Sequence, residues 1–177
     1  MTGELAIKWD AFEKARHEFL EHLSGFDTSN FNKQPEDGGW SASQVLEHIL
    51  SSETGTLGYM MKKSSSGWDG LEVTGQEQHN NSKALNERLS SDMRIAAPAV
   101  LPQPTNTFTQ EQIIEQWQQL RNKFQDFLNS IEERHYDKLV FKQPVAGMLN
   151  VVQAIEFLTL HIHHHIPQLQ RIQAAMA

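Results

Sequence analysis

Histidine is the residue type in this chain whose spacing most directly suggests chemistry. Nine histidines are present, and four of them gather at His161, His163, His164 and His165. On a helix, His161 and His165 are separated by four residues and lie about 40° apart, on neighbouring turns of one face. Both imidazoles can then reach one metal ion at about 2.0–2.1 Å from each nitrogen. The pair predicts a metal site.

The neighbours of this pair define its surroundings. An apolar stripe runs along the same predicted helix, and the pair lies at its edge with Gln168 close by, whereas His163 and His164 lie off the stripe. Such a pair can also be two hydrogen-bonded or solvated histidines without a ligand. Pro167 removes a backbone donor inside the helix and should bend its axis. Because Ile162 interrupts the cluster and the apolar register continues beyond it, the cluster is not a purification tag.

His48 is the third candidate, and its own pattern is ambiguous. Its predicted helix has an apolar stripe centred on other positions, and His48 shares its side with Ser52, Gly55 and Tyr59. Small residues there leave space for a ligand, but periodicity alone favours an exposed histidine. The remaining histidines have no partner at ligand spacing and are predicted to lie at the surface: His17, His22, His79 and His135.

The chemistry of such a site follows from its ligands. The chain has no cysteine, so any metal must be held by nitrogen and oxygen. Three imidazoles suit Zn²⁺, Ni²⁺ or Fe²⁺ and leave a coordination position open, as catalytic sites do. No carboxylate has an obvious fourth-ligand position. Glu53 and Glu156 are candidates for supporting the ligands, with a solvated side chain the favoured interpretation of Glu156.

Four long amphipathic segments must position these residues. Apolar residues recur at three- and four-residue steps over 3–24, 42–62, 110–132 and 151–173. Ser41 with Gln44, and Thr109 with Gln112, form capping-box patterns at two of the helix starts, and Asn150 caps the last helix.

The connections complete the predicted fold. Residues 136–149 are predicted to form a loop, and 64–107 a long crossover connection with a short helix over 82–93. Without any alternating strand pattern, the chain is predicted to be all-α, a four-helix bundle forming one domain over 1–177.

Composition limits the partners. The net charge of −7 argues against nucleic acid, which requires a basic patch. No apolar run is long enough for a membrane span, and no signal peptide is evident, so we expect a cytoplasmic protein.

Two motifs resemble those of the DinB/YfiT-like superfamily. Residues 39–49 (GWSASQVLEHI) are similar to its second-helix motif, and residues 161–169 after the Pro/Gly turn at 144–151 are similar to its closing H-x-x-x-H-x-x-Q motif. The resemblance implies an up-down-down-up bundle, often dimeric, with a divalent ion such as nickel or zinc on His48, His161 and His165. It gives Gln168 at most a supporting role. The long segment 64–107 and the proline at Pro167 depart from the family pattern. The substrates of the relatives are therefore not assigned to this chain.

Two classes of function remain open. Relatives implied by the resemblance include transferases that use a low-molecular-weight thiol, thiol-dependent isomerases and metal-dependent hydrolases. The first hypothesis is therefore a metal-dependent transferase or hydrolase of a small molecule. The alternative is a non-catalytic metal-binding module or dimeric interaction protein, in which a carboxylate such as Glu53 or a partner chain closes the coordination sphere.

Overall fold

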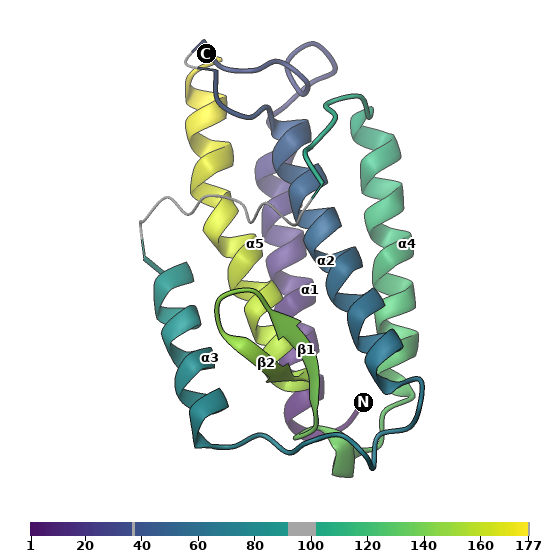
Figure 1. The fold of residues 1–177 in the computed structure, drawn as a ribbon. Helices are drawn as coiled ribbons and strands as arrows, with labels where there is room; N and C mark the ends of the chain where they lie inside the picture. The colour runs from purple at the N-terminus through teal and green to yellow at the C-terminus, as the bar shows by residue number, and fades with distance from the viewer. Residues whose placement is uncertain (37, 92–101, 177) are drawn as a thin grey trace.

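The architecture is mostly helical, with one small sheet. The computed structural model describes residues 1–36, 38–91 and 102–176. Four long helices lie side by side, as the amphipathic pattern predicts (Figure 1). They are α1 (Gly3–Leu23), α2 (Ala42–Ser64), α4 (Gln110–Asn129) and α5 (Val151–Ala174).

Three of these helices begin at capping boxes. In each box, the side chain of the capping residue accepts a hydrogen bond from the backbone three residues later, where a glutamine side chain accepts one in return. The boxes fix the starts of the two helices that carry the candidate histidines. The pairs are Ser41 with Gln44, Thr109 with Gln112 and Asn150 with Gln153.

Aromatic side chains join α1 to α4 in the core. The rings of Phe12 and Phe124 meet edge to face with centroids 5.9 Å apart, and those of Phe19 and Trp117 at 5.7 Å. All four side chains are fully buried. Among helices in the described part of the chain, none is long and apolar enough to cross a membrane.

The prediction of a loop at 136–149 is wrong in part. This segment contains most of an antiparallel hairpin of β1 (Leu139–Gln143) and β2 (Gly147–Asn150), and the 3₁₀ turn η1 (Glu133–His135) precedes it. The strands were not predictable from alternation because Leu139, Val140 and Phe141 are all buried in succession. Gly147, with φ of 77°, begins the returning strand, which runs directly into α5.

The crossover helix α3 (Gln76–Leu89) begins earlier than the predicted Ser82. Its first turns are polar and carry no apolar stripe, so periodicity could not detect them. The predicted end at Met93 lies outside the described residues. Helix α3 packs along α5, where the Asn86 side chain donates to Glu156 at 2.9 Å.

Candidate metal centre

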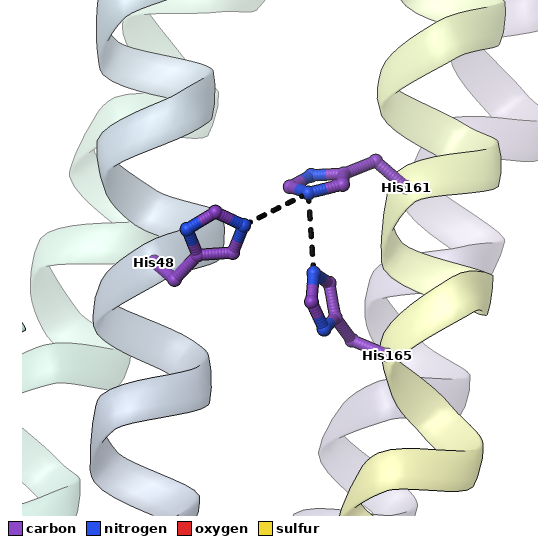
Figure 2. A group of neighbouring side chains, drawn as sticks. All are labelled: His48, His161 and His165. Atoms are coloured by element: carbon purple, nitrogen blue, oxygen red, sulfur yellow. Dashed lines mark hydrogen bonds between the residues drawn. The ribbon is translucent and has the colours of Figure 1, made fainter. Parts of the chain in front are cut away.

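Three histidine rings converge between α2 and α5 (Figure 2). The Nε2 atom of His161 lies 3.1 Å from Nε2 of His48 and 3.1 Å from Nε2 of His165. The structure thus brings together all three histidines singled out in the sequence. Each is buried, with exposed fractions of 4% for His48, 8% for His161 and 7% for His165.

The spacing of the nitrogens fits a single ion. When two imidazole nitrogens bind one metal ion at about 2.0–2.1 Å, their separation depends on the nitrogen–metal–nitrogen angle. It is about 2.8–3.0 Å at a right angle and about 3.3–3.4 Å at a tetrahedral angle. The 3.1 Å separations lie between these values. Small side-chain shifts therefore suffice to place His48, His161 and His165 around one ion.

The three imidazoles are neutral at neutral pH. Burial, together with the nearby His164, lowers the pKa of His48 to about 4. Burial and then the charge of His48 lower the pKa of His165 to about 3. The pKa of His161 falls well below its ordinary value, first through burial and then through the neighbouring imidazoles. Each ring therefore keeps one nitrogen lone pair, which is what a metal ligand requires.

Gln168 orients the His165 ring. Its side-chain oxygen accepts a hydrogen bond from Nδ1 of His165 at 2.8 Å. The proton of the neutral ring accordingly lies on Nδ1, and the lone pair lies on Nε2, which faces the other two histidines. A hydrogen bond of this kind fixes the tautomer of metal-binding histidines. This geometry is the one expected for a residue that supports the site.

His161 carries an unpartnered polar atom. Its Nδ1 is buried and finds no hydrogen-bond partner among the residues that the structure describes. The ring stacks on Phe157 with centroids 5.7 Å apart and planes 21° apart. Burying such a group without a partner costs about 1–3 kcal/mol. Coordination of a metal ion through Nε2 would offset that cost. The unpartnered Nδ1 is therefore compatible with a ring that binds metal through its other nitrogen.

His48 is buried, which corrects the expectation from periodicity that it is exposed. Trp40, just before the cap of α2, lies against its ring with centroids 5.2 Å apart. The adjacent Glu47 accepts hydrogen bonds from the backbone of Thr105 at 2.6 Å and of Asn106 at 2.7 Å. Residues at the end of the crossover connection thus cover this turn of α2. A helical wheel cannot show such a long-range contact.

Glu53 does not reach the histidines, contrary to the expectation that it supports them. It is fully buried, and its carboxylate faces α4. One oxygen accepts from Trp117 at 2.8 Å and from Nε of Arg121 at 3.0 Å, and the other accepts from Nη2 of Arg121 at 2.8 Å. Both oxygens are therefore engaged in a buried ion pair. Burial nonetheless raises the pKa of Glu53, against the opposing charge of Arg121.

The other histidines of the cluster point elsewhere. His163 is exposed, with Nε2 3.1 Å from a carboxylate oxygen of Glu18, and His164 Nδ1 lies 3.1 Å from the backbone oxygen of Leu89 on α3. Within the described ranges, the group able to hold an ion consists of His48, His161 and His165.

His135 is a second correction, because it is buried and not at the surface. Its ring stacks on Trp68 with centroids 5.7 Å apart, and its Nε2 lies 3.2 Å from Asp69. The residue belongs to the short turn η1, where helical spacing gives no signal. His17 and His79 are exposed, as predicted.

These features define a mostly helical scaffold with a small hairpin and a buried three-histidine cluster between two long helices. The model of the DinB superfamily matches residues 11–169, and the chain belongs to that superfamily. The uncharacterized protein YuaE of Bacillus subtilis is 24% identical over 162 residues, covering 92% of this chain and 94% of YuaE.

A solved structure has the same fold. It is YfiT from Bacillus subtilis, described as a probable metal-dependent hydrolase with an unusual four-helix bundle topology. The TM-score is 0.64 at 15% sequence identity, and the match covers 99% of this chain and 90% of YfiT. At this identity the likeness concerns the fold.

Proposed function

We propose that the chain is a metal-dependent enzyme that acts on a small molecule, as a thiol transferase or a hydrolase. The observation that carries the proposal is the convergence of three buried, neutral imidazoles without a carboxylate, among the described residues, at ligand distance. His48, His161 and His165 would hold the ion, with Gln168 orienting His165. Three protein ligands leave a position for an exchangeable molecule, which is the arrangement of catalytic sites.

A divalent ion such as Zn²⁺, Ni²⁺ or Fe²⁺ would, when bound, lower the pKa of a thiol or water and polarise an electrophile. The role of the protein is to hold three nitrogens at fixed separations and to exclude bulk water around them. The low exposure of all three rings supports that role. The description of YfiT as a probable metal-dependent hydrolase and the resemblance to thiol transferases support the two reaction types.

The proposed partners are a small-molecule substrate and, for the transferase, a low-molecular-weight thiol. Formation of a homodimer is proposed from the family resemblance alone. A net charge of −7 supports the exclusion of nucleic acid.

We also propose the up-down-down-up order of the four long helices. Contacts support it: Lys8 pairs with Glu156, and further along both helices Glu18 contacts His163, as expected if α1 and α5 run in the same direction. Helices α1 and α4 meet with opposite directions, since Phe12 contacts Phe124 and Phe19 contacts Trp117.

The test begins with metal analysis of freshly purified protein and continues with the cobalt-substituted form. One ion per chain, with an absorption spectrum that changes when a thiol or an anion is added, is the result expected for an open coordination position. Thiol transfer to a model alkylating electrophile, assayed with several thiols, is then compared with hydrolysis of model esters and amides. A metal-loaded protein with a closed, unresponsive spectrum and neither activity would refute the proposal in favour of a binding module.

A further inference from the structure

The three histidines of the candidate metal centre are held in different ways. His165 is fixed by its hydrogen bond to Gln168, and His161 stacks on Phe157. The Nδ1 atom of His48 makes no hydrogen bond to any residue in the described part of the chain. Metal-binding histidines normally have their second ring nitrogen fixed by a hydrogen bond. The orientation of the His48 ring therefore requires another explanation.

Packing against Trp40 supplies that explanation. The rings of Trp40 and His48 lie with centroids 5.2 Å apart and planes 49° apart. Trp40 is partly buried and packs against the hydrophobic core. It directly precedes Ser41, the cap of α2. The position of the Trp40 ring therefore depends on the corner where the chain enters α2.

Asn106 ties this corner to the rest of the molecule. Its side-chain oxygen accepts a hydrogen bond from the Ser41 hydroxyl at 2.5 Å, and its side-chain nitrogen donates to the backbone oxygen of Asn32 at 2.8 Å. Its backbone N–H donates at 2.7 Å to Glu47, the residue before His48. Asn106 has a φ of 62°, in the left-handed region that asparagine and glycine tolerate best. One residue thus connects the loop before α2, the cap of α2 and the turn that carries His48.

We propose that Trp40 and Asn106 are positioning residues of the metal centre and that they set its metal affinity through His48. Trp40 holds the His48 ring by packing, in place of a hydrogen-bond acceptor. Asn106 holds Trp40 and the first turns of α2 in their places. These roles rest on the metal site of the proposed function, but they do not depend on the reaction at that site.

The Zn²⁺ affinity of the full-length protein, measured by chelator competition, tests the proposal. Trp40→Leu keeps an apolar side chain but removes the ring that contacts His48, and it should lower the affinity about 10–100-fold. Trp40→Phe keeps an aromatic ring and should stay within about threefold of the wild type. Asn106→Gly removes both side-chain hydrogen bonds while the left-handed conformation stays accessible, and it should also lower the affinity about 10–100-fold.

The cobalt-loaded proteins provide a measurement that a general loss of stability would not change. At full occupancy, the visible absorption bands of Trp40→Leu should differ from those of the wild type, because the geometry of the His48 ligand changes. Trp40→Phe should keep the wild-type bands.

Asp27→Ala is the matched control for Asn106→Gly. It removes the hydrogen bonds that the Asp27 side chain accepts from the backbone of Ser29 and Asn30, in a loop that does not contact the histidines. Both the Zn²⁺ affinity and the cobalt spectrum should stay unchanged. Circular dichroism verifies that every variant is folded.

The outcomes separate the roles of these residues from the metal site itself. If the wild type binds one ion but Trp40→Leu or Asn106→Gly binds it equally tightly, the positioning roles are overturned while the metal site stands. Equal weakening by Trp40→Phe and Trp40→Leu, or by Asp27→Ala and Asn106→Gly, would also overturn them. If the wild type binds no ion in the same titration, both the positioning roles and the metal site are refuted.

Discussion

Replacing His161 by alanine should remove metal binding more completely than any other single change. The Nε2 atom of His161 stands 3.1 Å from the corresponding atoms of both other histidines, so it is the shared vertex of the cluster. Altering a residue that only orients a ligand typically lowers metal affinity by about 10–100-fold. Loss of a ligand itself should lower it by at least about 100-fold.

The effect can be measured as thermal stabilisation by Zn²⁺. At a free concentration of about 100 times Kd, binding to the folded state adds about 2.7 kcal/mol to the free energy of unfolding. For a chain of this size, that raises Tm by about 5–11 °C. At the same concentration, a 100-fold weaker variant gains about 0.4 kcal/mol, or about 1–2 °C. The two outcomes are well separated in a calorimetric scan.

His163→Ala is the matched control, since it removes an imidazole from an exposed position two residues away. It should bind one ion and show the full stabilisation. The metal-free His161→Ala protein should retain its helical content, because the substitution also removes a buried nitrogen without a partner. If His161→Ala kept wild-type metal content and stabilisation, or if His163→Ala lost them, the assignment of the ligands would be refuted.

Three further predictions concern the surroundings of the site. Gln168→Leu should lower metal affinity about 10–100-fold in a chelator competition titration, because the His165 ring loses its orienting acceptor; unchanged affinity would contradict that role. Arg121→Met should lower the free energy of unfolding in urea by about 3–5 kcal/mol, because Glu53 is left buried and unpaired, and Arg121→Met/Glu53→Leu should recover most of it. The metal-free protein should lose stability as pH falls below about 6.5. In the folded protein, His48 and His165 have pKa values of about 4 and about 3, so they stay neutral there, whereas the same residues of the unfolded chain bind protons. Each should contribute about 1–2 kcal/mol between pH 6.5 and 5, and urea titrations showing constant stability over that range would contradict the expectation.

The sequence predicted those elements whose signal is local. The four long helices follow from apolar spacing, and their starts follow from capping residues such as Ser41 and Thr109, whose partners lie three residues away. The hairpin at 139–150 has no such signal, because its first strand is buried on consecutive residues and does not alternate. The first turns of α3 were missed for the opposite reason, since they are polar on every face.

The residues of the candidate metal centre also differ in whether a local sequence signal predicts them. His161 and His165 share one helix, so their proximity follows from a spacing of four residues. His48 lies 113 residues away from His161 in the chain. The burial of His48 depends on how α2 packs against other segments of the chain. The spacing of apolar residues within α2 does not predict this packing. The assignment of His48 as a ligand therefore depends mainly on the family motif.

The packing of α2 gives the physical reason that His48 faces α5. Three side chains of α2 point in different directions around the helix axis: Glu47, His48 and Glu53. The separation is about 100° between Glu47 and His48, about 140° between His48 and Glu53, and about 120° between Glu53 and Glu47. Glu47 is held by the backbone of residues 105–106, and Glu53 is held by Trp117 and Arg121 of α4. Two buried carboxylates on different faces therefore fix the rotation of α2, and the remaining direction carries His48 towards His161. The geometry of the candidate metal centre thus depends on polar contacts of side chains that are not themselves part of it.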